Sequence, residues 1–501
     1  MRGKKALINI VSSFGLQIIT IVCGFIIPRM IIGAYGSNVN GLITSITRFL
    51  AYITLLESGF GPVVKSILYK PIANKEKKTI EEILKTSEKF FRKIACIFVV
   101  YILILCVIFP MMVSNEFGAI FTVSLVLIIA VSTFAEYYFG MTYKLYLGAE
   151  QKTYVISVIQ VVTILINTIF VLLLIHLGAS IHVVKLVTCF IFLLRPIIQN
   201  IYVKKKYNID LKEAKGNYEI KQKWDGLAQH IAYVIHTNTD VAILTMCTNV
   251  AEVSVYSIYL MIVNSVKNIA HSFTGGLDAA FGDMIVKNEK ENLNKNFKVY
   301  EGLYFTISTI LFTASIFLII PFMKLYTQGI TDANYIRPVF AYILIAAEFL
   351  CVIRQPYNDL VKAAGHFRQT RIGAWIEAIL NITISIILVW NYGIVGVVIG
   401  TLIAMTIRTI EFMYYTSKHI LNRSVLYTFK RLLAITLEVL GVILIMHVIP
   451  KFEITNYKTW ILQAIIVTVI SAFIVIIINC ILYRKNVKNT YKKMKNIIGL
   501  K

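Results

Sequence analysis

Apolar runs of about 20 residues recur along nearly the whole chain, and they constrain its fold more than any other feature. A helix of this length spans a hydrocarbon core of about 30 Å. Only 15% of the 501 residues are charged, against about a quarter in soluble domains. We therefore expect an all-α polytopic membrane protein with about 14 transmembrane helices. The predicted helices lie near 6–33, 40–68, 93–113, 119–142, 153–175, 181–203, 228–247, 252–282, 302–325, 337–360, 372–391, 394–416, 431–449 and 459–482.

The basic residues are distributed unevenly between the connections. Of 50 Lys and Arg, 39 lie in alternate connections and at the two termini, whereas the intervening connections hold Lys451 and Lys458. Basic segments near helix ends stay in the cytoplasm, so we expect a multi-pass protein of the cytoplasmic membrane with both termini inside. The net charge of +24 thus indicates topology rather than nucleic-acid binding. The basic tail predicts contact with anionic membrane lipid, and the uncleaved start predicts an anchoring first helix.

Sequence motifs for catalysis are absent. All seven cysteines fall in apolar runs without a CxxC pair, and there is no P-loop, metal or nucleophile motif. The outer loops are too short to form the catalytic domain that a membrane glycosyltransferase needs. We therefore expect a transporter that is not an enzyme and has no metal or cofactor. Its energy would come from Na⁺ or H⁺ coupling, or from the membrane potential.

An internal repeat divides the chain. Ala149 and Gly178 match Ala364 and Gly393, both pairs being 215 positions apart, and the segment 39–42 is similar to 253–256. Two six-helix lobes followed by two further helices explain this pattern, and such repeats bracket a central substrate site. The predicted parts are an N-lobe at 1–203, a cytoplasmic linker at 204–227, a C-lobe at 228–416, two additional helices at 431–482 and a basic cytoplasmic tail at 483–501.

Several short segments resemble one family in their order and spacing. These are IPRMIIGAYG at 27–36 followed by NGL at 40–42, LLESGFGP at 55–62, DVAIL at 240–244 and VYS at 255–257. Over roughly 6–416 the chain resembles the polysaccharide transporter branch (Wzx-type flippases) of the multidrug/oligosaccharidyl-lipid/polysaccharide flippase superfamily, with a MATE-like fold of two lobes around a central cleft.

The resemblance implies a function. It implies a flippase that moves an undecaprenyl-diphosphate-linked oligosaccharide repeat unit to the outer leaflet, for capsule, exopolysaccharide or O-antigen biosynthesis. Its implied partners are the lipid-linked oligosaccharide, a polysaccharide polymerase and glycosyltransferases. Two alternatives stay open. One is a lipid II flippase, and the other is a cation-coupled multidrug antiporter, which the excess of deep basic residues disfavours.

Charged residues deep in the predicted helices are the candidate substrate-binding residues, because a charge in the bilayer needs a partner or a wet cavity. They are Arg29, Arg48, Lys267 and Asp240, whose helices line the central cleft in the family fold. The guanidinium fork suits a diphosphate, while Asp240 could balance a basic residue or bind a coupling cation with Asn238 and Thr239. Arg29 could instead reach the interface, and Lys267 could form a structural ion pair.

Further candidates for the cleft or for coupling are Glu57, Arg354 and Glu377. Arg48 and Glu57 are nine residues apart, so they face opposite sides of a regular helix. Arg354 and Glu377 lie in the cytoplasmic halves of their helices, where pairing between helices is as reasonable as substrate contact.

Overall fold

The computed structural model describes residues 2–57, 59–220, 227–272, 277–448 and 453–484, and these residues form helices joined by short connections, with no strand. The prediction of an all-α polytopic fold is confirmed. The helices are α1 Arg2–Ala51, α2 Phe60–Asn74, α3 Lys77–Met112, α4 Ala119–Ala135, α5 Met141–Ala149, α6 Thr153–His176, α7 Ile181–Tyr207, α8 Leu227–Cys247, α9 Val250–Ser272, α10 Leu277–Val286, α11 Lys290–Tyr326, α12 Pro338–Ala363, α13 Arg371–Tyr415, α14 Val425–Val448 and α15 Tyr457–Leu482.

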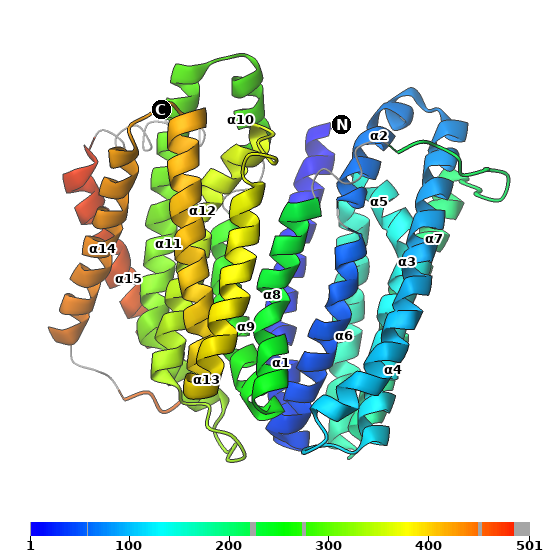
Figure 1. Cartoon of the computed structure of the whole chain (residues 1–501), viewed down its shortest axis with the longest axis horizontal. Coiled ribbons are helices and arrows are strands. Elements are labelled where there is room, and N and C mark those ends of the chain that lie inside the picture. Colours follow the sequence, from blue (N-terminus) through cyan, green and yellow to red (C-terminus); the bar gives the residue numbers. More distant parts are fainter. Residues whose placement is uncertain (1, 58, 221–226, 273–276, 449–452, 485–501) are drawn as a thin grey trace. The chain divides into compact units, whose positions relative to one another are not determined.

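The chain forms two compact units, an N-terminal unit of residues 1–257 and a C-terminal unit of residues 258–501. Within each unit the long helices run side by side as a bundle (Figure 1). The division falls inside α9, so α8 belongs with the N-terminal unit, where it packs against α1. This division lies later in the chain than the predicted lobe limits at 203 and 228, which stay a prediction.

Bends at glycine let two of the helices cross a membrane twice. α1 bends at Gly36 (φ 86°, ψ 167°) and α13 bends at Gly393 (φ 52°, ψ −131°), a backbone region that favours glycine. Eleven of the described helices are long and apolar enough to span a membrane. When α1 and α13 count twice and the 21-residue, less apolar α8 is added, the number agrees with the prediction of about 14 crossings.

The second predicted helix, 40–68, was wrong in its extent. α1 ends at Ala51, and a 3₁₀ turn follows over Tyr52–Leu56. Gly59 (φ 79°) then precedes the start of α2 at Phe60. The apolar run continues through this break because its side chains are buried within the unit, as Ile53 and Phe60 are.

Within the N-terminal unit, a contact joins the segments 39–42 and 253–256, which the internal repeat relates to each other. The Asn40 amide nitrogen donates to Ser254 Oγ (2.8 Å), and a second buried contact joins Ser45 and Thr245 (2.7 Å). The helices approach so closely here that a Cβ on Gly41 would lie 1.7 Å from the Val250 carbonyl oxygen. A glycine is therefore required at this crossing.

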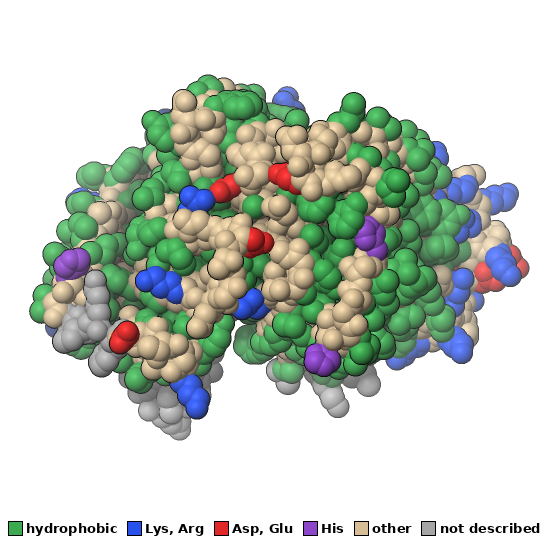
Figure 2. Space-filling view, turned by 90° about the horizontal axis from the view of Figure 1, so that it is seen from below, with side chains coloured by type: hydrophobic (Ala, Val, Ile, Leu, Met, Phe, Trp, Pro, Cys, Tyr) green, Lys and Arg blue, Asp and Glu red, His purple; other side chains and the backbone are tan. Residues whose placement is uncertain are grey.

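Charged side chains are sparse on the molecular face shown in Figure 2. Hydrophobic side chains cover much of this face, and its Lys and Arg are most frequent along one edge. This distribution fits the uneven charge of the connections, while the orientation of the termini stays a prediction.

Candidate substrate-binding site

The two predicted arginines of the first helices lie on α1, on either side of its bend at Gly36. Both residues are half-buried, and both take part in polar or ring contacts. A Cβ on Gly33 would lie 3.2 Å from Nη1 of Arg29, so this guanidinium lies over the next turn of its own helix. Arg29 and Arg48 thus place two permanent positive charges on otherwise apolar stretches of one helix.

Asp240 is buried on α8, with 4% of its surface exposed. It accepts a hydrogen bond from the Tyr256 hydroxyl on α9 (Oη–Oδ2 2.7 Å). The neighbouring Asn238 amide donates to the Val234 carbonyl of its own helix (2.9 Å). Consecutive helical side chains point about 100° apart, so Asn238, Thr239 and Asp240 face different directions. The described residues contain no group of three or more His, Cys, Asp or Glu that could hold a metal ion, and cation binding at Asp240 stays a prediction.

Lys267 forms an ion pair within the C-terminal unit. Its Nζ lies 2.6 Å from Oε2 of Glu348 on α12, and the two side chains are 19% and 6% exposed. This partner is 81 positions away along the chain, and the sequence alone could not identify it. Arg29, Arg48 and Asp240 belong to the N-terminal unit and Lys267 to the C-terminal unit, so the four-residue cradle stays a prediction.

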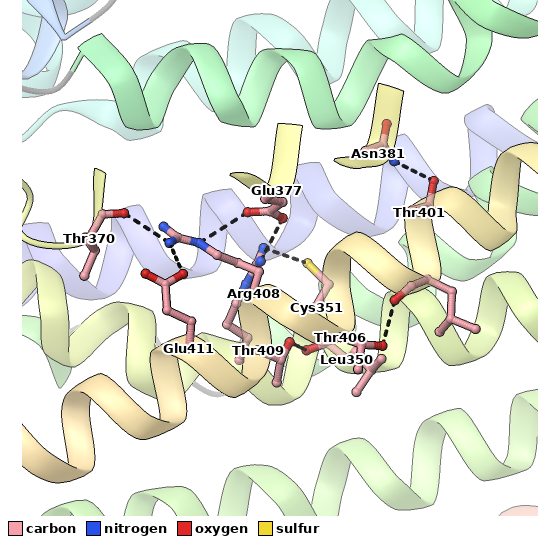
Figure 3. A network of polar contacts seen from close by, with 12 residues as sticks. Leu350, Cys351, Thr370, Glu377, Asn381, Thr401, Thr406, Arg408, Thr409 and Glu411 are labelled. Carbon is pink, nitrogen blue, oxygen red and sulfur yellow. Dashed lines mark hydrogen bonds and ion pairs between the residues drawn. The ribbon is translucent and has the colours of Figure 1, made fainter. Parts of the chain in front are cut away.

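Arg354 and Glu377 are part of a buried charge network on α12 and α13. Figure 3 shows Glu377, Arg408 and Glu411 of this network. Arg354 Nη1 donates to Glu377 Oε1 at 2.8 Å, and Arg408 Nε lies 3.3 Å from the other carboxylate oxygen. Arg408 Nη1 also donates to Glu411 (2.5 Å) and to the Thr370 carbonyl (3.1 Å). Two guanidinium groups and two carboxylates therefore balance one another, which favours a structural role for these residues.

Glu57 lies after the 3₁₀ turn and borders a cavity of about 480 Å³ in the N-terminal unit. It accepts a hydrogen bond from the Tyr137 hydroxyl (3.4 Å). Burial raises the pKa of Glu57, and the nearby Lys144 and His230 only partly offset that effect. Lys144 itself is paired with Glu136 on the cavity wall (2.7 Å). The break between α1 and α2 thus turns Glu57 toward other polar side chains.

Within the C-terminal unit, buried polar contacts join α14 and α15 to each other and the segment before α14 to α11, and the sequence did not reveal them. Arg423, just before α14, donates two hydrogen bonds to the fully buried Glu301 of α11 (2.6 and 3.2 Å). Arg431 of α14 donates to Asn479 of α15 (3.0 Å), which in turn donates to Glu438 (2.7 Å).

Comparisons with known proteins agree on the fold. No protein-family model matches the sequence, and no curated protein does. Among solved structures, the chain is similar to the lipid II flippase MurJ in an inward closed conformation (TM-score 0.69, 16% identity), which covers 96% of this chain and 100% of its own. An inward-facing multidrug resistance MATE family transporter of the MOP superfamily gives a TM-score of 0.58 and 14% identity over 82% of this chain and 98% of its own. The eukaryotic MATE transporter AtDTX14 gives a TM-score of 0.57 and 12% identity over 83% of this chain and 93% of its own. The chain therefore has the fold of membrane transporters and flippases of this superfamily.

Proposed function

We propose that the protein is a flippase that moves an undecaprenyl-diphosphate-linked oligosaccharide repeat unit across the cytoplasmic membrane by alternating access. The observation that carries the proposal is the pair of half-buried arginines on α1, Arg29 and Arg48. A guanidinium stays charged at every physiological pH and can hold two phosphate oxygens at once. A charged group on an apolar helix needs a partner group or a wet cavity, and we expect a substrate diphosphate to add to the contacts that both arginines already make.

The additional helices α14 and α15 support a lipid-linked substrate over a small drug. The lipid II flippase covers 96% of this chain, whereas the two multidrug transporters cover 82% and 83%. The part of this chain that the two multidrug transporters do not cover is comparable in length with α14, α15 and the C-terminal tail together. The buried contact of Arg423 with Glu301 fastens this pair to α11, as expected of a permanent part of the transporter.

A lipid II flippase is the second candidate, and the similarity to MurJ favours it. Both candidates need a cationic site for a diphosphate, so Arg29 and Arg48 do not separate them. A multidrug antiporter is a weaker candidate, because it would need an acidic binding site rather than a basic one.

A complementation experiment tests the proposal. Cells that lack this protein should lose surface polysaccharide and accumulate the lipid-linked repeat unit, and the wild-type chain should reverse both effects. Arg48→Ala should be made and inserted normally but should not restore export. Lys212→Ala, which removes an exposed charge from the linker, is the matched control and should restore export. Normal polysaccharide with Arg48→Ala and Arg29→Ala would contradict the proposed role of these arginines.

A further inference from the structure

Two cavities in the N-terminal unit share part of their walls and form what we call the polar chamber. The larger cavity, about 480 Å³, lies among the end of α1, the turn after it, α2, α4 and α5. The smaller cavity, about 90 Å³, lies between the end of α4, α6 and α7. Thr133 and Glu136 line both cavities. The combined volume lies within the range of about 300–1,000 Å³ that is typical of small-molecule sites.

A π-helical segment, Glu136–Gly140, builds the shared wall. Such segments are rare and occur frequently at functional sites. Here the segment directs two consecutive side chains, Glu136 and Tyr137, to the larger cavity. Gly140 allows close packing against α7, because a Cβ there would lie 2.9 Å from the Pro196 Cβ. The helix is thus deformed at the point where the chamber is formed.

The charges on the chamber walls nearly cancel. In the larger cavity the carboxylates of Glu57 and Glu136 face the ammonium groups of Lys65 and Lys144. Arg195 adds one guanidinium in the smaller cavity. A site for a cation would offer mainly acceptors and a site for an anion mainly donors. This chamber offers both in similar number, which suits an uncharged ligand with many hydroxyl groups.

Gln199 adds an amide to the wall of the smaller cavity. The residue is only 4% exposed and lines this cavity beside Gln160 and Arg195. A side-chain amide both donates and accepts hydrogen bonds, so we expect it to bind a hydroxyl group of a ligand in the cavity. Arg195 uses its Nε to bond Thr163 Oγ1 (2.8 Å), and this bond holds its guanidinium at the cavity wall.

We propose that the polar chamber binds the uncharged sugar part of the transported lipid. A hydroxyl group donates and accepts at once, so it can bond a carboxylate on one side and an ammonium, guanidinium or amide on the other. Thr47 lines the larger cavity and directly precedes Arg48. The Arg48 side chain, proposed to bind the diphosphate, points about 100° away from Thr47 around α1, so the sugar and the diphosphate would contact different faces of this helix. This inference rests on the proposed function and adds sugar recognition to it.

The test measures binding of the sugar without its lipid. The probe is the oligosaccharide released by mild acid from the lipid-linked intermediates of cells lacking this protein. It is titrated against the full chain in lipid nanodiscs, with saturation-transfer NMR as the readout. We expect binding to wild type, and about tenfold weaker binding for Gln199→Leu and for Glu57→Gln, as for the loss of one or two hydrogen bonds. Gln463→Leu removes an amide from α15 and should bind as wild type does.

The outcomes separate the sugar site from the flippase function. Arg48→Ala should bind the free oligosaccharide normally while losing export. If the wild-type chain exports the repeat unit but does not bind the free oligosaccharide, or if the chamber variants bind it normally, the chamber holds water only and the inference is wrong. If the chain binds the sugar but does not restore export, the proposed function fails instead. Thermal unfolding of each variant excludes misfolding as the cause of lost binding.

Discussion

Removing Lys267 should destabilise the protein and also stop transport, and a second substitution separates these two effects. Lys267 Nζ lies 2.6 Å from Glu348 Oε2, and only 6% of the Glu348 side chain is exposed. Breaking a buried ion pair from one side costs about 3–5 kcal/mol. Because Lys267 is 19% exposed, we expect Lys267→Met to lower the free energy of unfolding by about 3 kcal/mol, the lower end of that range.

The double variant Lys267→Met/Glu348→Gln removes both charges and should recover most of this loss. The stability of the four proteins in detergent, arranged as a double-mutant cycle, gives the energy of the pair directly. Export is then measured for the double variant in cells. A stable double variant that does not export supports substrate contact by Lys267, whereas full export means that the pair is purely structural. An unchanged stability of Lys267→Met would refute the ion-pair reasoning.

Three further predictions concern stability. Gly41→Ala should lower the free energy of unfolding by about 1–3 kcal/mol, because its Cβ would lie 1.7 Å from the carbonyl oxygen of Val250 at the start of α9. Gly15→Ala, whose Cβ would have nothing within 4 Å, should leave thermal unfolding unchanged. Arg423→Met should cost about 3–5 kcal/mol by leaving Glu301 without its bidentate partner, and adding Glu301→Gln should restore much of the thermal midpoint. Burial and then a second histidine lower the pKa of His366, so the folded state resists its protonation. The stability that this residue contributes is complete above the unfolded pKa of about 6.5 and is lost as pH falls from that value through the lower folded pKa. His366→Gln should flatten this part of the pH–stability curve.

The helices were predictable because hydropathy and length determine which segments can lie in a bilayer. Each predicted apolar run overlaps one or two of the described helices, and several helices extend beyond their run. α3 begins at Lys77 rather than near residue 93, and α11 begins at Lys290 rather than near residue 302. These extensions are polar, and hydropathy does not report a helix that continues outside the hydrocarbon. The bends of α1 and α13 fall at Gly36 and Gly393, which the sequence placed in connections between separate helices, with Gly393 as the counterpart of Gly178.

The polar contacts were less predictable than the helices. Deep charges could be found by their position in apolar runs, as Lys267 and Asp240 were. Their pairing could not be found, because partners such as Arg423 and Glu301 lie 122 positions apart and meet only through tertiary packing. Gln199 gave no signal at all, because an amide in an apolar run is common and only its burial beside a cavity makes it informative.

Transport by the purified protein tests the central claim most directly. The chain is reconstituted into liposomes with a labelled undecaprenyl-diphosphate-linked oligosaccharide, and the fraction of the sugar that becomes accessible to an impermeant lectin is measured over time. We predict that the wild-type chain moves the labelled lipid between the leaflets and that Arg48→Ala loses most of this activity. Movement of lipid II but not of the oligosaccharide lipid, or efflux of a cationic drug with neither lipid moved, would contradict the account.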